Sequence, residues 1–226
     1  MSSKFKFLVL IIFTHNAWSQ NNLFLINNSN LIVTMSANSL DETTNKIEGS
    51  QYIDEQFYPS TFSCLSEVTP PIRYNVYKEE MEFIFEGKLY YLNKNKIENC
   101  EITLYNNTYK YIINYDNKES NGYLVILNKS KDLKYILYKK EKVKYVPKYI
   151  PSSTYADERP AKYVIEKSKY FIKIQDSLIE FPEKTSELLK LFPNFKDSIE
   201  YFLKEKKVKF IEESSLLELM NFLNTL

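Results

Sequence analysis

A chain of 226 residues is long enough to bury the core of one ordinary domain, or of one domain with a small appendage. Its 30 basic and 29 acidic residues give a formal net charge of +1. Proteins that bind nucleic acid draw much of their affinity from a basic face that displaces counterions, so this balance argues against a nucleic-acid partner. The richness in Lys, Asn, Ile, Phe and Tyr is typical of an AT-rich genome, although an aromatic binding surface would also account for the 19 tyrosines.

The N-terminus has the three regions of a secretory signal peptide. Lys4 and Lys6 precede an apolar run at residues 7–13, and small residues follow at Ala17 and Ser19. The run is far shorter than the ~20 residues that span a bilayer, so we expect no transmembrane segment after cleavage. We expect cleavage after Ser19, which predicts an extracytoplasmic protein. In a Gram-negative cell its location would be the periplasm.

Removal of this segment changes the chemistry that the chain can perform. It contains the only histidine, His15, and the only tryptophan, Trp18. Without an imidazole, neither a Ser-His-Asp nor a Cys-His catalytic device can form, and histidine-containing zinc sites are excluded as well. Three glycines are too few for a phosphate-binding loop. We therefore expect no cofactor and no metal.

Behind the signal peptide (residues 1–19), residues 20–50 are rich in Asn, Ser and Thr and predict a poorly ordered lead-in with room for one strand. Residues 51–183 change to short β-branched and aromatic runs separated by turn residues, which predicts an antiparallel β meander of about ten short strands. Its clearest hairpin turn is Glu86-Gly87. The expected strands lie at residues 72–77, 81–85, 88–92, 101–104, 109–115, 122–127, 135–138, 142–146, 162–166, 170–174 and 178–181.

From residue 184 to residue 226 the apolar residues change to helical spacing. Sets such as Leu216, Leu219, Met220 and Leu223 predict two to three short helices packed on the sheet. Their expected N-caps are Asn194 for the second helix and Ser214 or Ser215 for the last. The predicted fold class is α+β, with the helices segregated at the C-terminal end.

Two cysteines, Cys64 and Cys100, follow the predicted cleavage point. An oxidising compartment permits a disulfide between them. Two unpaired thiols at separate sites are the alternative, because spacing in sequence does not measure their separation in space.

The proline-punctuated loop at residues 147–160 contains the candidate ligand-binding residues. Tyr155, Asp157, Glu158 and Arg159 place an acidic pair beside an aromatic ring and a guanidinium in a long polar loop that interrupts the sheet. A pair of carboxyl groups is what a glycosidase requires. An ordinary solvated crossover is the alternative interpretation.

Four segments resemble an uncharacterised family of exported, β-rich proteins of the Bacteroidota. They are GSQYIDEQF (49–57), RYNVYKEEMEF (73–83), GYLVIL (122–127) and FLKEKKVKFIEESSLLELMNFLN (202–224). The resemblance implies a signal peptide, a strand meander and a lysine-rich helical end. It supplies no catalytic or binding residue, and the two cysteines are not part of the pattern.

Two functional hypotheses follow from these observations. The first is a non-catalytic envelope protein, a binding module whose partner is another envelope protein or an outer-membrane component. The second is a carboxylate-based protein that binds or hydrolyses glycans, with Asp157 and Glu158 facing a cleft beside Tyr155.

Overall fold

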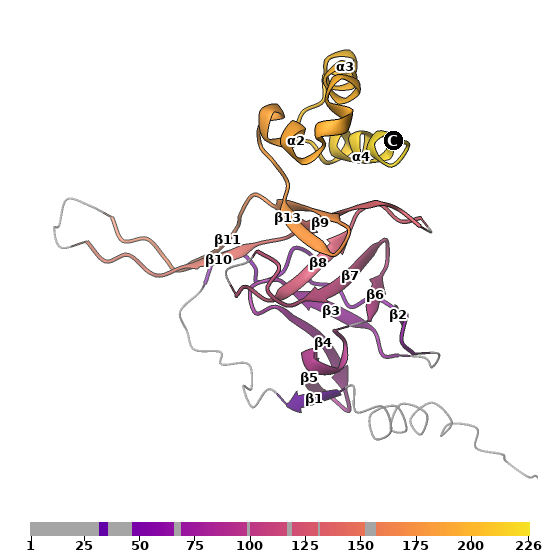
Figure 1. Ribbon diagram of the computed structural model, residues 1–226. Helices are drawn as coiled ribbons and strands as arrows, with labels where there is room; N and C mark the ends of the chain where they lie inside the picture. Colours follow the sequence, from indigo (N-terminus) through magenta and orange to yellow (C-terminus); the bar gives the residue numbers. More distant parts are fainter. Residues whose placement is uncertain are drawn as a thin grey trace, which may run out of the picture.

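A computed structural model describes residues 32–35, 47–65, 69–98, 100–116, 119–130, 132–151 and 157–226 (Figure 1). The predicted signal peptide, most of the predicted lead-in and Tyr155 lie outside the described residues. The predicted α+β class is confirmed, because antiparallel sheets make up the body and the helices follow at the C-terminal end.

The strands form one four-stranded, one two-stranded and one seven-stranded sheet in the described part of the chain. Their ladders are all antiparallel, as the meander predicts. The four-stranded sheet has the order β1(Ile32–Met35), β5(Lys88–Leu92), β4(Glu80–Phe85), β3(Ile72–Asn75). The seven-stranded sheet has the order β13(Ser177–Glu180), β12(Lys169–Ile174), β9(Tyr135–Lys140), β8(Gly122–Ile126), β7(Asn107–Ile112), β6(Glu101–Leu104), β2(Ser60–Phe62). The two-stranded ribbon pairs β10(Val143–Val146) with β11(Lys162–Ile165) and extends away from the body (Figure 1).

The β4–β5 hairpin confirms the predicted turn. Phe85 pairs with Lys88, so Glu86 and Gly87 alone form the loop. Both have positive φ, 49° and 73°, which matches the right-handed twist of the flanking strands. After β5, the short 3-10 helix η1(Lys94–Lys96) leads the chain out of this sheet and into the seven-stranded one.

The long hairpin that contains β9 to β12 has an irregularity that matters for the site. Lys140 pairs with Lys169, whereas Lys142 accepts a backbone hydrogen bond from Glu166. One residue, Glu141, therefore lies opposite two, Lys167 and Ser168, which is the arrangement of a β-bulge. A bulge bends the strand and changes the direction of nearby side chains, and here it separates the sheet from the projecting ribbon.

The main core joins the two larger sheets. The buried residues Ile72, Met81 and Phe83 of the four-stranded sheet belong to the same cluster as Ile102 and Tyr109 of the seven-stranded sheet. Strand β8 is buried along its whole length because both of its faces are covered. Burying apolar surface on both faces makes β8 the centre of the fold.

Three helices lie together at one end of the molecule: α2(Thr185–Leu191), α3(Lys196–Lys206) and α4(Glu213–Leu223) (Figure 1). Their apolar faces form a second core with Leu137 of β9 and Ile172 of β12, so the helices pack on the sheet. Asn224 fixes this packing, because its side chain accepts from the backbone N–H of Tyr135 and donates to the carbonyl of the same residue.

The predicted N-caps are wrong. Asn194 lies inside the 3-10 helix η2(Pro193–Phe195), which runs directly into α3 and leaves no room for a separate cap. Helix α4 begins at Glu213, one residue before Ser214, and no side chain caps it. Tertiary packing of the apolar faces replaces capping as the source of helix stability here. No helix in the described part of the chain has the length and apolar character needed to cross a bilayer.

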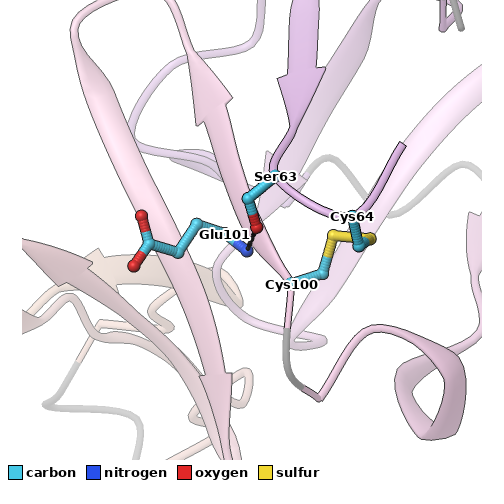
Figure 2. Close-up of a disulfide and its surroundings, with 4 residues drawn as sticks. All are labelled: Ser63, Cys64, Cys100 and Glu101. Atoms are coloured by element: carbon cyan, nitrogen blue, oxygen red, sulfur yellow. Dashed lines mark hydrogen bonds between the residues drawn. A yellow bond between two sulfur atoms is a disulfide. The ribbon is translucent and has the colours of Figure 1, made fainter. Parts of the chain in front are cut away.

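Cys64 and Cys100 form a disulfide, with their Cα atoms 5.3 Å apart (Figure 2). The bond joins the chain just after β2 to the residue just before β6, two strands that already pair. Beside it, Ser63 accepts a hydrogen bond on Oγ from the backbone N–H of Glu101, at 2.9 Å (Figure 2). Of the two alternatives that spacing left open, the disulfide is therefore the one that forms.

The double substitution Cys64→Ser/Cys100→Ser is expected to lower the free energy of unfolding by about 4 kcal/mol. Without the bond, the loop between two cysteines 36 residues apart is open in the unfolded chain, which then has more conformational freedom. Urea denaturation measures the loss of unfolding free energy in three samples: the variant, the oxidised parent protein and the reduced parent protein. Reduction should reproduce the effect of the substitutions, and an unchanged denaturation midpoint in both would contradict the prediction.

Candidate functional site

The acidic loop that the sequence singles out lies on the projecting ribbon. Asp157, Glu158 and Arg159 are all exposed, and Tyr155 is outside the described residues. Glu158 forms an ion pair with Lys148 at 2.7 Å, and the Arg159 guanidinium lies 5.2 Å from the ring centre of Tyr149. A glycan site at this loop stays a prediction, and the residues considered next lie elsewhere.

A cavity of about 90 Å³ lies where the two larger sheets meet. We call it the inter-sheet cavity. Its floor is made of buried residues and its mouth of exposed ones, so it opens from the core to solvent. It is lined by Ile53, Asp54, Gln56, Tyr58, Arg73, Tyr74, Val76, Leu104, Tyr105, Asn107, Tyr109 and Glu141.

Glu141 places a carboxylate on the floor of this cavity, opposite the β-bulge. The residue is only 6 % exposed. Its ion-pair partner among the described residues is Lys139, whose Nζ lies 3.6 Å away. The same Nζ lies closer to Glu213 of α4, at 3.0 Å. Burial raises the pKa of Glu141, and the attraction of Lys139 offsets this only in part.

Two pairs of tyrosine rings form the walls. Tyr74 and Tyr109 meet edge to face with their centres 5.2 Å apart, and both are buried. Tyr58 and Tyr105 stack at 5.4 Å near the mouth, where Tyr105 is 72 % exposed. Tyr105 also has a φ of 51°, because with Asn106 it forms the two-residue hairpin turn between the paired residues Leu104 and Asn107.

Asp54 supplies a second carboxylate at the mouth. It accepts hydrogen bonds from the Tyr58 hydroxyl at 2.6 Å and from the backbone N–H of Gln56 at 2.9 Å, and these bonds lower the pKa of Asp54. The pKa of the Tyr109 hydroxyl is raised mainly by burial and further by the charges of both Glu141 and Asp54. Both carboxylates therefore act on the same hydroxyl from two sides of the cavity.

Arg73 of β3 fixes the wall on the side of residues 52–57. Its guanidinium lies over the rings of Tyr52 and Phe57, at 3.9 and 4.4 Å from their centres. It donates to the buried carboxylate of Glu82, to the Tyr52 hydroxyl and to the carbonyl of Glu55. Four of its five N–H groups have partners within the protein, so Arg73 has little donor capacity left for an anionic ligand.

A second buried charge pair supports the floor. Lys140 donates to Glu79 and, at 3.2 Å, to the Tyr74 hydroxyl, which itself donates to Glu79 at 2.8 Å. Burial lowers the pKa of Lys140, and it raises the pKa of Tyr74 together with the charge of Glu79. Gly122 permits this arrangement, because a Cβ there would lie 2.7 Å from a Glu79 carboxylate oxygen.

This site was missed at the level of sequence, because its residues come from separate segments that only the packing of two sheets brings together. A signal for it existed. Two segments of the family resemblance lie at the cavity. Residues 49–57 contribute Asp54 and Phe57, which is next to Tyr58 in the chain, on one side of the cavity. Residues 73–83 contribute Arg73 and Tyr74 on the other side. Within the described residues, no cluster of three or more His, Cys, Asp or Glu side chains is arranged to hold a metal ion.

Comparison of the chain with protein-family models, with curated proteins and with solved structures gives no match. The resemblance to an exported family of the Bacteroidota therefore stays a prediction. Any function has to be argued from the geometry of the site.

Replacing Arg73 by Met is expected to lower the free energy of unfolding by about 3–5 kcal/mol, since it leaves the buried Glu82 carboxylate without its cation. Chemical denaturation measures the change. The other arginine of the chain is a matched control: Arg159→Met removes only an exposed cation–π contact and should cost less than about 1 kcal/mol. Adding Glu82→Gln to Arg73→Met should recover part of the loss, and equal costs for the two arginines would contradict this account.

Glu141→Gln is expected to stabilise the protein at neutral pH and to have little effect in acid. The pKa of Glu141 is raised in the folded state, so the folded protein holds the proton of this carboxyl more tightly than the unfolded chain does. The stability that this proton contributes is fully present below the ordinary carboxyl pKa, and it is lost as the pH rises through the raised pKa of the folded protein. The glutamine, which carries no charge, avoids that loss. Denaturation midpoints from about pH 3.5 to pH 7.5 test this, and a difference between the two proteins that does not change with pH would contradict it.

Proposed function

We propose that this chain is an exported, non-catalytic binding module of the cell envelope, and that the inter-sheet cavity is its ligand site. The observation that carries the proposal is the cavity itself. It combines tyrosine rings with a buried carboxylate, Glu141, that has only a long ion pair to Lys139. Mostly apolar and aromatic walls with a few convergent polar groups are the usual composition of small-ligand sites.

Rigid walls favour binding. Tyr74 on the floor is held by Lys140 and Glu79, and the opposite wall is held by Arg73 and Glu82. Side chains that are fixed before the ligand arrives lose little conformational entropy on binding, which strengthens affinity. The disulfide adds a covalent restraint next to β6, whose hairpin to β7 forms one wall of the cavity.

Export is supported by two independent features. The signal-peptide pattern of residues 1–19 predicts it, and the Cys64–Cys100 disulfide is typical of proteins that fold in an oxidising compartment. We infer a periplasmic or otherwise extracytoplasmic location, with an envelope protein or an outer-membrane component as the partner that carries the ligand.

The glycan hypothesis is the alternative, and the geometry favours it less. Its carboxylates, Asp157 and Glu158, are exposed, and Glu158 is already paired with Lys148. The inter-sheet cavity, at about 90 Å³, is smaller than the roughly 150 Å³ that accommodates a benzene ring. A sugar ring with its hydroxyl groups is larger than benzene.

The proposal is tested on protein secreted from its full-length gene in a bacterial host. The N-terminus of the periplasmic product is expected at Gln20, and ligand-observed NMR is then run with a panel of small amines, carboxylates and monosaccharides. At least one compound should bind and be recovered unchanged. Retention of residues 1–19, or no binding across the whole panel, would contradict the proposal.

A matched pair of variants locates the binding. Asn107→Trp places a large ring at the exposed mouth of the cavity and should abolish the NMR signal of the bound compound. Asn194→Trp makes the same change at an exposed position in the helical segment and should leave binding intact. If both variants bind as the parent protein does, the ligand site is not this cavity.

A further inference from the structure

We propose that the inter-sheet cavity binds the ammonium group of a small organic cation. The inference rests on the proposed function, because it names the ligand chemistry of that same cavity. It follows from the charge, the hydrogen-bonding capacity, the aromatic content and the size of the cavity.

The charged groups with spare capacity in this cavity are acceptors. Glu141 on the floor and Asp54 at the mouth are carboxylates. The one cation of the lining, Arg73, uses four of its five N–H groups on Glu82, Tyr52 and a backbone carbonyl. An anionic ligand would meet mainly uncharged donors, such as the Tyr109 hydroxyl and the side-chain amides of Gln56 and Asn107, and would face two negative charges, whereas an ammonium group meets charge and acceptors that match it.

Glu141 is held in a way that leaves room for a second cation. Its contact with Lys139, at 3.6 Å, is longer than a hydrogen bond, and Lys139 has a shorter contact with Glu213, at 3.0 Å. A ligand cation at Glu141 would therefore leave Lys139 with a carboxylate partner. A buried carboxylate with one distant partner is incompletely compensated, so a cation that reaches it gains a large share of its binding energy there.

The tyrosines complete the environment. Tyr74 and Tyr109 at the floor and Tyr58 and Tyr105 at the mouth supply four aromatic rings around one small space. Rings attract cations through the negative potential of their faces, so this environment favours an ammonium group. The attraction is stronger where the cation is removed from water, as it would be on this buried floor.

The volume sets the size of the group. A cavity of about 90 Å³ holds the head of a primary alkylammonium ion, and it is smaller than the roughly 150 Å³ apolar cavity that accommodates a benzene ring. We infer that the charged head enters the cavity and that the remainder of the ligand lies at the mouth, beside Tyr105 and Asn107.

The test compares ethanolamine with propan-1-ol, in which a methyl group replaces the ammonium group, by isothermal calorimetry and ligand-observed NMR on the secreted protein. Ethanolamine is expected to bind at least about tenfold more tightly than the neutral compound, since a charge-assisted hydrogen bond contributes ~1.5 kcal/mol or more. Equal affinity for ethanolamine and propan-1-ol would overturn the ammonium proposal and leave the proposed function standing. Binding of monosaccharides or carboxylates in place of amines would do the same.

Three single-charge variants connect the binding to the cavity. Glu141→Gln should weaken ethanolamine binding about tenfold or more, and Asp54→Asn, at an exposed position that no core contact depends on, should weaken it about two- to fivefold. Glu158→Gln removes the same charge from the distant ribbon and should have no effect. Unchanged affinity in both cavity variants, or a loss in Glu158→Gln alone, would overturn the proposal.

The ammonium group can belong to a free compound or to a lipid headgroup, and sedimentation with vesicles separates the two sources. Vesicles of phosphatidylethanolamine and phosphatidylglycerol are compared with vesicles of phosphatidylglycerol alone. Co-sedimentation that requires phosphatidylethanolamine and is lost in Glu141→Gln assigns the headgroup. Binding of free ethanolamine without co-sedimentation assigns a free cation, and the absence of both overturns the proposal.

Discussion

Tyrosine hydroxyls impose the main constraint on the interior of this protein. The core that joins the two sheets is rich in tyrosine, and each ring that is buried there brings an oxygen that is costly to leave without a hydrogen-bond partner. Where a carboxylate accepts a hydrogen bond from such a hydroxyl, it in turn requires a cation because a buried lone charge is strongly unfavourable. Tyr52–Glu82–Arg73 and Tyr74–Glu79–Lys140 are two relays of this kind. The Tyr123 hydroxyl, in the same core, has no hydrogen-bond partner in the described part of the chain.

These relays give the cavity polar and rigid walls at the junction of the two larger sheets. Apolar side chains could have filled this junction instead. One relay supports the floor through Tyr74, and the other holds the segment that carries Asp54. Glu141 differs from the carboxylates of the relays, because no tyrosine hydroxyl and no close cation uses it fully. The incomplete compensation of this one group is what distinguishes the proposed binding site from a structural network.

Much of the fold could be predicted from the pattern of residues. Turn chemistry located the Glu86-Gly87 hairpin, alternation located strands from Ile72 onward, and the change to helical spacing after residue 184 located the helices. Strand β1 lies in the lead-in, where one strand was expected without bounds, and β2 was not assigned, because its three residues carry too weak a pattern. The helix caps were wrong, since local signals such as Asn194 were outweighed by the 3-10 turn and by packing on β9.

The candidate site shows where reasoning from sequence ends. The acidic pair Asp157-Glu158 was noticed because the two residues are adjacent in the chain, yet the structure leaves them exposed on a ribbon. Asp54 and Glu141, which share one cavity, are separated in the chain by three strands of one sheet and five of the other, and a single-residue bulge directs one of them. A pattern along the chain does not encode that distance.

The sequence by itself determined the chemistry that residues 20–226 can carry out, because the types of residue present set the available acids, bases and ligands: carboxylates and tyrosines, and no imidazole. It also determined the antiparallel strands and the helical end, since both follow from local periodicity. Only the tertiary structure decided that the cysteines pair and that four tyrosines and two carboxylates share one cavity. These outcomes depend on how one sheet packs against another, and that packing is fixed by the burial and the hydrogen-bond partners of side chains far apart in the chain.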